Sequence, residues 1–182
     1  MLKNRLELAK YFAELGFKSG AEIGVAEGRY SEILCQNIPS LELIAIDTWD
    51  NYRTDRRAAG SHQTGEELTK ERLSPYKATI VKKASMDAVK DIADESLDFV
   101  YIDADHSYQA VKDDIREWAK KVRKGGIVSG HDYYIFPNSG NKDVINAVDE
   151  YVKENGLTLQ TTDWDENYQR WDERQPSWYF FN

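Results

Sequence analysis

A short apolar run at residues 99–102 is the feature that most constrains the fold of this chain. Its sequence, Phe-Val-Tyr-Ile, is β-branched and aromatic without polar alternation, which is typical of a strand buried on both faces of a parallel sheet. The run ends in Asp103, Asp105 and His106. Open α/β sheets bind ligands beyond the carboxyl ends of their strands, so these side chains are candidates for chemistry. Alternatively, the two aspartates only cap the next helix, whose expected N-cap is Ser107.

Strand and helix patterns alternate along most of the chain. A leading helical stripe ends at Gly16, a helix is expected at 30–38, and a capping box at Thr64 and a cap at Ser85 are expected to open two more. Strands are expected at 21–25, 41–46, 78–81, 97–102, 127–129, 157–161 and 178–181. This alternation predicts an α/β fold with a mostly parallel sheet and helices on both faces. No helix separates the last two strands, so the last strand is expected to be antiparallel.

Composition excludes several classes of partner. The chain has 182 residues, a net charge of −8 and an isoelectric point near 5.0, which disfavours nucleic acid. No apolar stretch resembles a signal peptide or reaches membrane length, so we expect a cytoplasmic protein without membrane contact. Cys35 is the only cysteine, which excludes an internal disulfide. Residues 48–64 are polar and predict a long loop. The sequence leaves the oligomeric state open, including a homo-oligomer.

The first two predicted strands end in residues that suit a nucleoside. Gly24 and Gly28 remove Cβ atoms where the backbone has to approach a ligand, and Asp47 is placed to accept hydrogen bonds from ribose hydroxyls. The dinucleotide fingerprint Gly-x-Gly-x-x-Gly fails, because only Gly24 of its three glycines is present. Glu22 adds an anion that would repel a pyrophosphate and favour a cationic ligand.

Four stretches resemble the class I S-adenosylmethionine-dependent methyltransferases. They are Ala-Glu-Ile-Gly-Val-Ala-Glu-Gly-Arg-Tyr-Ser, Ile-Ala-Ile-Asp-Thr-Trp, Tyr-Ile-Asp-Ala-Asp-His-Ser-Tyr and Gly-Gly-Ile-Val-Ser-Gly-His-Asp-Tyr, within residues 20–135. The likeness is to a small-molecule O-methyltransferase-like subgroup, from which Ala26 departs where many members have glycine. It implies a Rossmann-like seven-stranded sheet whose last strand inserts beside strand six. We expect one such domain over 1–182, with a leading helix at 1–16, a core at 20–162, and an aromatic insert and final strand at 163–182.

The resemblance also assigns cofactor-binding residues. It implies that Glu22, Gly24 and Gly28 line the methionine end of S-adenosylmethionine, and that Asp47 holds the ribose. Ser85 and Met86 would lie by the adenine. The predicted set is completed by Val25, Ser31, Thr48, Trp49 and Asp103, which belong to the same motifs.

In relatives that use a metal, an acid ends strand four and an acidic pair follows strand five. Asp103 matches the first position and His131-Asp132 matches the pair, which makes these three candidate ligands of Mg²⁺ or Mn²⁺. His106 matches the family's general base, and an imidazole titrates near the pH that such work favours. Asp105 is the second candidate catalytic residue.

The sequence therefore predicts methyl transfer from S-adenosylmethionine to an oxygen of a small molecule. Two alternatives stay open: a module that binds the cofactor without turnover, and a nicotinamide-dependent oxidoreductase. Candidates for contact with the acceptor are aromatic residues near the carboxyl side of the sheet: Tyr133, Tyr134, Phe136, Trp164, Tyr168 and Trp171.

Overall fold

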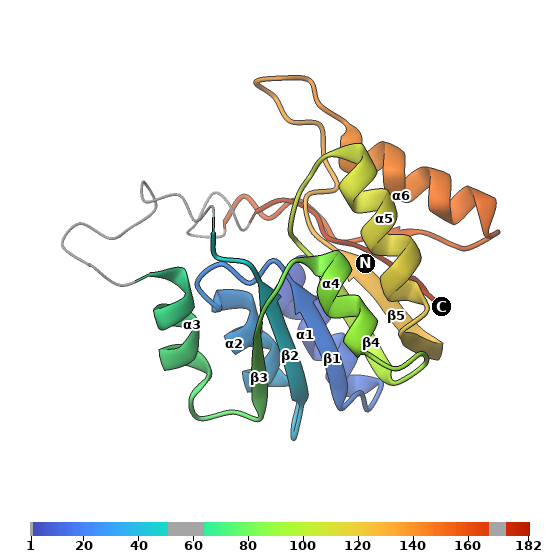
Figure 1. Ribbon diagram of the computed structural model, residues 1–182. Helices are drawn as coiled ribbons and strands as arrows, with labels where there is room; N and C mark the ends of the chain where they lie inside the picture. The colour runs from blue at the N-terminus through green and yellow to red at the C-terminus, as the bar shows by residue number, and fades with distance from the viewer. Residues whose placement is uncertain (1, 51–63, 168–173) are drawn as a thin grey trace.

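The computed structural model describes residues 2–50, 64–167 and 174–182 (Figure 1). Most of the loop predicted at 48–64 and the two aromatic residues Tyr168 and Trp171 lie outside these ranges. In chain order the elements are α1 (Arg5–Glu14), β1 (Ser19–Ile23), α2 (Arg29–Asn37), β2 (Glu42–Asp47), α3 (Gly65–Leu73), β3 (Ala78–Lys82), α4 (Ser85–Ala88), the short 3-10 helix η2 (Val89–Asp91), β4 (Leu97–Ile102), α5 (Tyr108–Ala119), β5 (Val122–Gly130), α6 (Asp143–Glu154), β6 (Gln160–Thr161) and β7 (Trp178–Phe181).

The strands form one seven-stranded sheet in the order β3-β2-β1-β4-β5-β7-β6. The first five strands pair in parallel, whereas β7 is antiparallel to both β5 and β6. The predicted Rossmann-like fold is confirmed, and so are the antiparallel last strand and its insertion beside strand six.

Helices cover both faces of the sheet, with α4 and α5 in front of it and α1 and α2 behind it in the view of Figure 1. Successive side chains of β4 point to opposite faces of the sheet, so each face presents apolar side chains to the helices that cover it. Val100 and Ile102 pack in a core cluster with residues of α5 and α6, while Phe99 and Tyr101 pack with residues of α1 and α2. Burial of β4 on both faces, predicted from its apolar run, is confirmed.

Three predicted elements differ from the structure. The predicted helix at Ser85 is a single turn of α4 followed by η2, and its N-cap is Ala84 rather than Ser85. The strand predicted at 127–129 begins earlier, at Val122, and passes through Gly125 and Gly126. A shift in the pairing register with β4 and a φ of +73° at Gly125 accommodate the glycines. The sixth strand is only two residues long.

No helix within the described ranges is long and apolar enough to cross a membrane.

Candidate functional site

A cavity of about 890 Å³ opens at the carboxyl ends of β1, β2 and β4. This is the edge at which the sequence analysis placed the ligand. Of the residues predicted to bind the cofactor or to act in catalysis, eight line it: Gly24, Asp47, Thr48, Ser85, Met86, Asp103, Asp105 and His106. Ala26, at the position where the motif departs from glycine, lines it as well. Its lining holds five aspartates and one lysine, so its potential favours a cationic ligand.

Gly24 is required by a close approach of backbone to backbone. Its φ is +88°, and a Cβ at this position would lie 2.0 Å from the carbonyl oxygen of Asp103. Gly28 has a φ of +75° and faces Thr69 of α3, whose Cα would be 3.1 Å from such a Cβ. Both glycines were expected to make room for a ligand. The structure shows a further reason for both, which is to let β1 and the turn after it pack against the end of β4 and against α3. Gly24 also lines the cavity, so its expected contact with a ligand stays a prediction.

Asp47 is held in place by backbone amides. The N–H of Ala26 donates to its Oδ2 at 2.9 Å and the N–H of Trp49 donates to its Oδ1 at 2.8 Å. Ala26 and Trp49 have φ angles of 54° and 52°, conformations that are rare outside glycine and concentrate at functional sites. Each carboxylate oxygen keeps a second lone pair for a ligand hydroxyl.

Trp49 is not among the described residues that line the cavity. Its Nε1 donates to the carbonyl of Ala26 at 2.8 Å, and its ring packs with Val25 and Leu73. The side chain therefore ties the turn after β1 to the turn after β2. Trp49 and Val25, both predicted to bind the cofactor, belong to a core cluster and not to the described lining of the cavity.

Glu22 is buried, at 2% exposure, and is also not among the described residues that line the cavity. Ser31, another predicted cofactor residue, donates a hydrogen bond to its carboxylate. Burial raises the pKa of Glu22 to about 8, against the opposing effects of the Ser31 hydrogen bond and the charge of Arg5. Glu22 and Ser31 therefore form a pair that supports β1 and α2.

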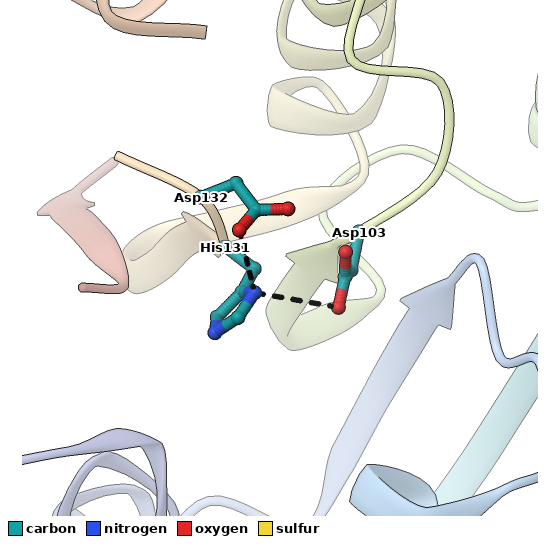
Figure 2. A group of neighbouring side chains, drawn as sticks. All are labelled: Asp103, His131 and Asp132. Carbon is teal, nitrogen blue, oxygen red and sulfur yellow. Dashed lines mark ion pairs between the residues drawn. The ribbon is translucent and has the colours of Figure 1, made fainter. Parts of the chain in front are cut away.

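The ends of β4 and β5 bring Asp103, His131 and Asp132 together (Figure 2). The Nδ1 of His131 lies 3.3 Å from Asp132 Oδ1 and 3.8 Å from Asp103 Oδ2. Figure 2 shows this nitrogen turned toward both carboxylates, while the other ring nitrogen points away. That second nitrogen, Nε2, is buried without a hydrogen-bond partner among the described residues. The three residues expected to share a metal are thus neighbours.

His106 lies between the same two carboxylates. Its Nε2 is 3.0 Å from Asp132 Oδ2 and 3.4 Å from Asp103 Oδ1. Burial by itself lowers the pKa of His106, but its interactions with the two aspartates outweigh that effect and raise the pKa to about 10. For Asp103 and Asp132 burial has the opposite effect and raises the pKa. The interactions with His106 and His131 outweigh burial, so the pKa of each carboxyl is lowered. In this arrangement His106 keeps its proton at neutral pH, so it accepts one only after these contacts weaken.

Asp105 accepts a hydrogen bond from the backbone N–H of Ser107 at 2.8 Å. The structure thus gives it the structural role that was the alternative for this residue, a turn before α5. Ser107 is the N-cap of α5, as expected, although its side chain makes no capping hydrogen bond.

Arg5 is the site residue that the sequence analysis missed. It projects from α1 with 6% exposure. Its Nη1 lies 3.4 Å from Asp103 Oδ2, and its guanidinium stacks over the ring of Tyr30 at 4.7 Å from the centroid. A signal was present, because Arg5 shares the buried face of α1 with Leu8, Ala9 and Phe12, and a charge on an apolar face requires a buried partner.

An aromatic cluster of Tyr134, Phe136 and Trp164 lies beside His106. The ring of Phe136 lies 6.1 Å from the His106 ring and 4.5 Å from that of Tyr134, which meets Trp164 edge-on at 5.6 Å. Tyr133 points elsewhere and donates to Asp149 at 2.7 Å. Of the aromatic residues expected to contact an acceptor, Tyr134, Phe136 and Trp164 therefore cluster.

Comparisons with known proteins agree with this geometry. Residues 21–133 match a family described as a methyltransferase domain. An uncharacterized protein, y4gI of Sinorhizobium fredii, is 28% identical over 120 residues, and the matched region covers 61% of this chain but only 12% of that protein.

Solved structures share the fold. An O-methyltransferase from Bacillus cereus in complex with SAH is 12% identical with a TM-score of 0.65, and the match covers 96% of this chain and 80% of that one. The O-methyltransferase TomG from Streptomyces achromogenes, involved in tomaymycin synthesis and solved in complex with SAM, is 15% identical with a TM-score of 0.67 over 98% and 79% of the two chains.

Proposed function

The chain belongs to this methyltransferase family, and from that membership we propose that it transfers a methyl group from S-adenosylmethionine to an oxygen of a small molecule. The observation that carries the proposal is the cavity at the strand ends. Five aspartates and one lysine line it, a charge pattern that attracts a sulfonium cation and repels the pyrophosphate of a dinucleotide.

When bound, S-adenosylmethionine supplies a methyl group on a positively charged sulfur. Asp47 is the residue that would hold the ribose, because its carboxylate is oriented by the amides of Ala26 and Trp49 and keeps free lone pairs. The transfer is an in-line displacement, so the protein contributes mainly by positioning the acceptor and removing its proton.

His106 is the residue that would take the acceptor's proton. It lines the cavity and its side chain is 39% exposed, so an acceptor hydroxyl can reach it. His106 can act as a base when Asp103 and Asp132 bind another group in its place. Loss of these two contacts lowers the pKa of His106 toward the ordinary range. The aromatic cluster of Tyr134, Phe136 and Trp164, which lies beside His106, would hold an apolar part of the acceptor.

A divalent cation fits the neighbouring cluster. Asp103, His131 and Asp132 each offer one ligand atom, all within 4.8 Å of one another. An imidazole nitrogen beside two carboxylates suits Mn²⁺ better than Mg²⁺. A cation held there would lower the pKa of an acceptor hydroxyl. Binding would require Arg5 and His106 to loosen their contacts with the carboxylates.

Calorimetric titration with S-adenosylmethionine, S-adenosylhomocysteine and NAD tests the proposal. We expect the first two to bind and NAD not to bind. Binding of NAD alone would favour an oxidoreductase and overturn the proposal. Binding without methyl transfer to any of a panel of small hydroxylated acceptors would favour the alternative of a cofactor-binding module.

A further inference from the structure

A buried carboxylate in the cavity has no part in the proposed transfer. Asp114 of α5 is 4% exposed and lines the cavity together with Ser85. Its Oδ1 accepts a hydrogen bond from the Ser85 hydroxyl. No sequence pattern assigned a role to Asp114, and the family resemblance implies that Ser85 lies by the adenine.

The hydroxyl of Ser85 is fully engaged as a donor. Trp118 Nε1 donates to the Ser85 oxygen at 2.8 Å, and the single hydroxyl proton goes to Asp114. Ser85 therefore has no proton left for a base edge. Within the described part of the chain, Asp114 Oδ2 receives no hydrogen bond, and it is not one of the fully buried polar atoms that lack a partner. This oxygen therefore keeps accessible surface at the cavity that Asp114 lines. Trp118 and Ser85 fix the carboxylate so that its second oxygen is the one available to a ligand.

The lysine of the cavity lining already has a carboxylate partner other than Asp114. Lys83 is the one lysine of the lining, and its Nζ is paired with Asp91 at 2.5 Å. Burial raises the pKa of Asp114 to about 6, so the group is mainly ionised at pH 7. An ionised carboxylate is a pure acceptor, and the matching ligand group is an amine with hydrogen to donate.

We propose that Asp114 is a specificity-determining residue, which selects an adenine base by accepting a hydrogen bond from its 6-amino group through Oδ2. The inference rests on the proposed function, because it assumes that a nucleoside occupies the cavity with its ribose at Asp47. A 6-oxo purine would bring a second acceptor against the carboxylate and leave the buried charge unpaired, so it should be rejected.

Paired titrations with S-adenosylhomocysteine and S-inosylhomocysteine, its 6-oxo counterpart, test the assignment. For the wild type we expect S-adenosylhomocysteine to bind roughly 10- to 150-fold more tightly. In Asp114→Asn the amide oxygen can still accept from Ser85 while its NH₂ faces the base, so the ratio of the two affinities should fall to about one or invert. Glu117→Gln is the matched control. It removes one charge from the same helix at a side chain paired with Arg116 and Lys120, and it should leave the ratio unchanged.

A third ligand makes the test independent of any variant. The 6-deamino analogue of S-adenosylhomocysteine lacks the donor without adding an acceptor, and the wild type should bind it roughly tenfold more weakly. If the wild type binds S-adenosylhomocysteine but does not discriminate among the three ligands, or if Asp114→Asn retains the full ratio, the role of Asp114 is overturned and the proposed function stands. If the wild type binds none of them, the proposed function itself is overturned.

Discussion

The two sides of the cavity hold their carboxylates by different means. On the β1–β2 side, Asp47 is oriented by the backbone amides of Ala26 and Trp49. On the β4–β5 side, Asp103 and Asp132 contact the side chains of Arg5, His106 and His131. Both sides use the same chemical group at the same edge of one sheet.

The difference is one of charge compensation. Neutral amides orient Asp47 without balancing its charge, so it is ready for a ligand that brings hydrogen-bond donors. The cationic side chains of Arg5 and His106 balance Asp103 and Asp132, so a proton, an acceptor or a metal ion has to replace a contact that already exists. We therefore expect the β1–β2 side to govern cofactor affinity and the β4–β5 side to govern turnover.

His106→Ala should give the largest separation between the two sides. Loss of the base should lower kcat by about 10²- to 10⁴-fold, while the affinity for S-adenosylhomocysteine stays near that of the wild type. Steady-state kinetics and calorimetry measure the two quantities. Gln109→Ala, at an exposed position that bonds Asp113, is the control and should alter neither. A variant at His106 with wild-type kcat would remove the assignment of the base.

Metal removal should affect the β4–β5 side alone. Dialysis against a chelator should lower turnover by roughly 10- to 100-fold, and added Mn²⁺ should restore it, because Asp103, His131 and Asp132 provide the ligands. Calorimetric titration with Mn²⁺ should show binding to the wild type and no binding to Asp103→Asn. Full turnover after chelation would mean that the protein works without a metal and that His106 alone carries the base role.

Glu22 should make stability depend on pH. The native carboxyl keeps its proton up to about pH 8, whereas the unfolded group, with an ordinary value of 4.5, loses it earlier. The native state thus binds more protons across this window, so the free energy of unfolding should fall as pH rises from about 5 to 8. Denaturant unfolding should show that the free energy of unfolding of the wild type falls by roughly 2–4 kcal/mol over this pH range, and that Glu22→Gln lacks this fall. Glu14→Gln, at an exposed position of α1, should behave as the wild type does.

Trp49→Phe should have the smallest effect, and on the β1–β2 side. It removes the 2.8 Å hydrogen bond to the Ala26 carbonyl, which should cost about 1 kcal/mol of stability. Because this bond holds the turn that orients Asp47, the affinity for S-adenosylhomocysteine should fall by about two- to fivefold. Unchanged affinity would mean that the backbone keeps Asp47 in place without the tryptophan.

The fold was predictable because its signals are local. The apolar run of β4 required burial on both faces, and the two clusters around Val100 and Phe99 provide it. The position of Asp47 followed from its place at the end of β2. The capping box of Thr64 and Glu67, read from four residues, is present as expected.

The parts that could not be predicted depend on contacts between distant residues. Ser85 looked like a helix cap, but Asp114, 29 residues away, takes its hydroxyl. Arg5 contacts Asp103 across 98 positions of the chain. Its place on the apolar face of α1 indicates that it has a buried partner, but nothing local to either residue identifies that partner as Asp103. The charge state of His106 likewise depends on Asp132, which a different strand delivers.

Titration of S-adenosylhomocysteine into the wild type, Asp47→Ala and Asp132→Ala, under identical conditions, tests the central claim most directly. We predict that Asp47→Ala weakens binding by about 30- to 150-fold, because it loses charge-assisted hydrogen bonds to the ribose, and that Asp132→Ala changes it by less than about threefold. Equal affinities for the wild type and Asp47→Ala, or no binding to the wild type at all, would contradict the account.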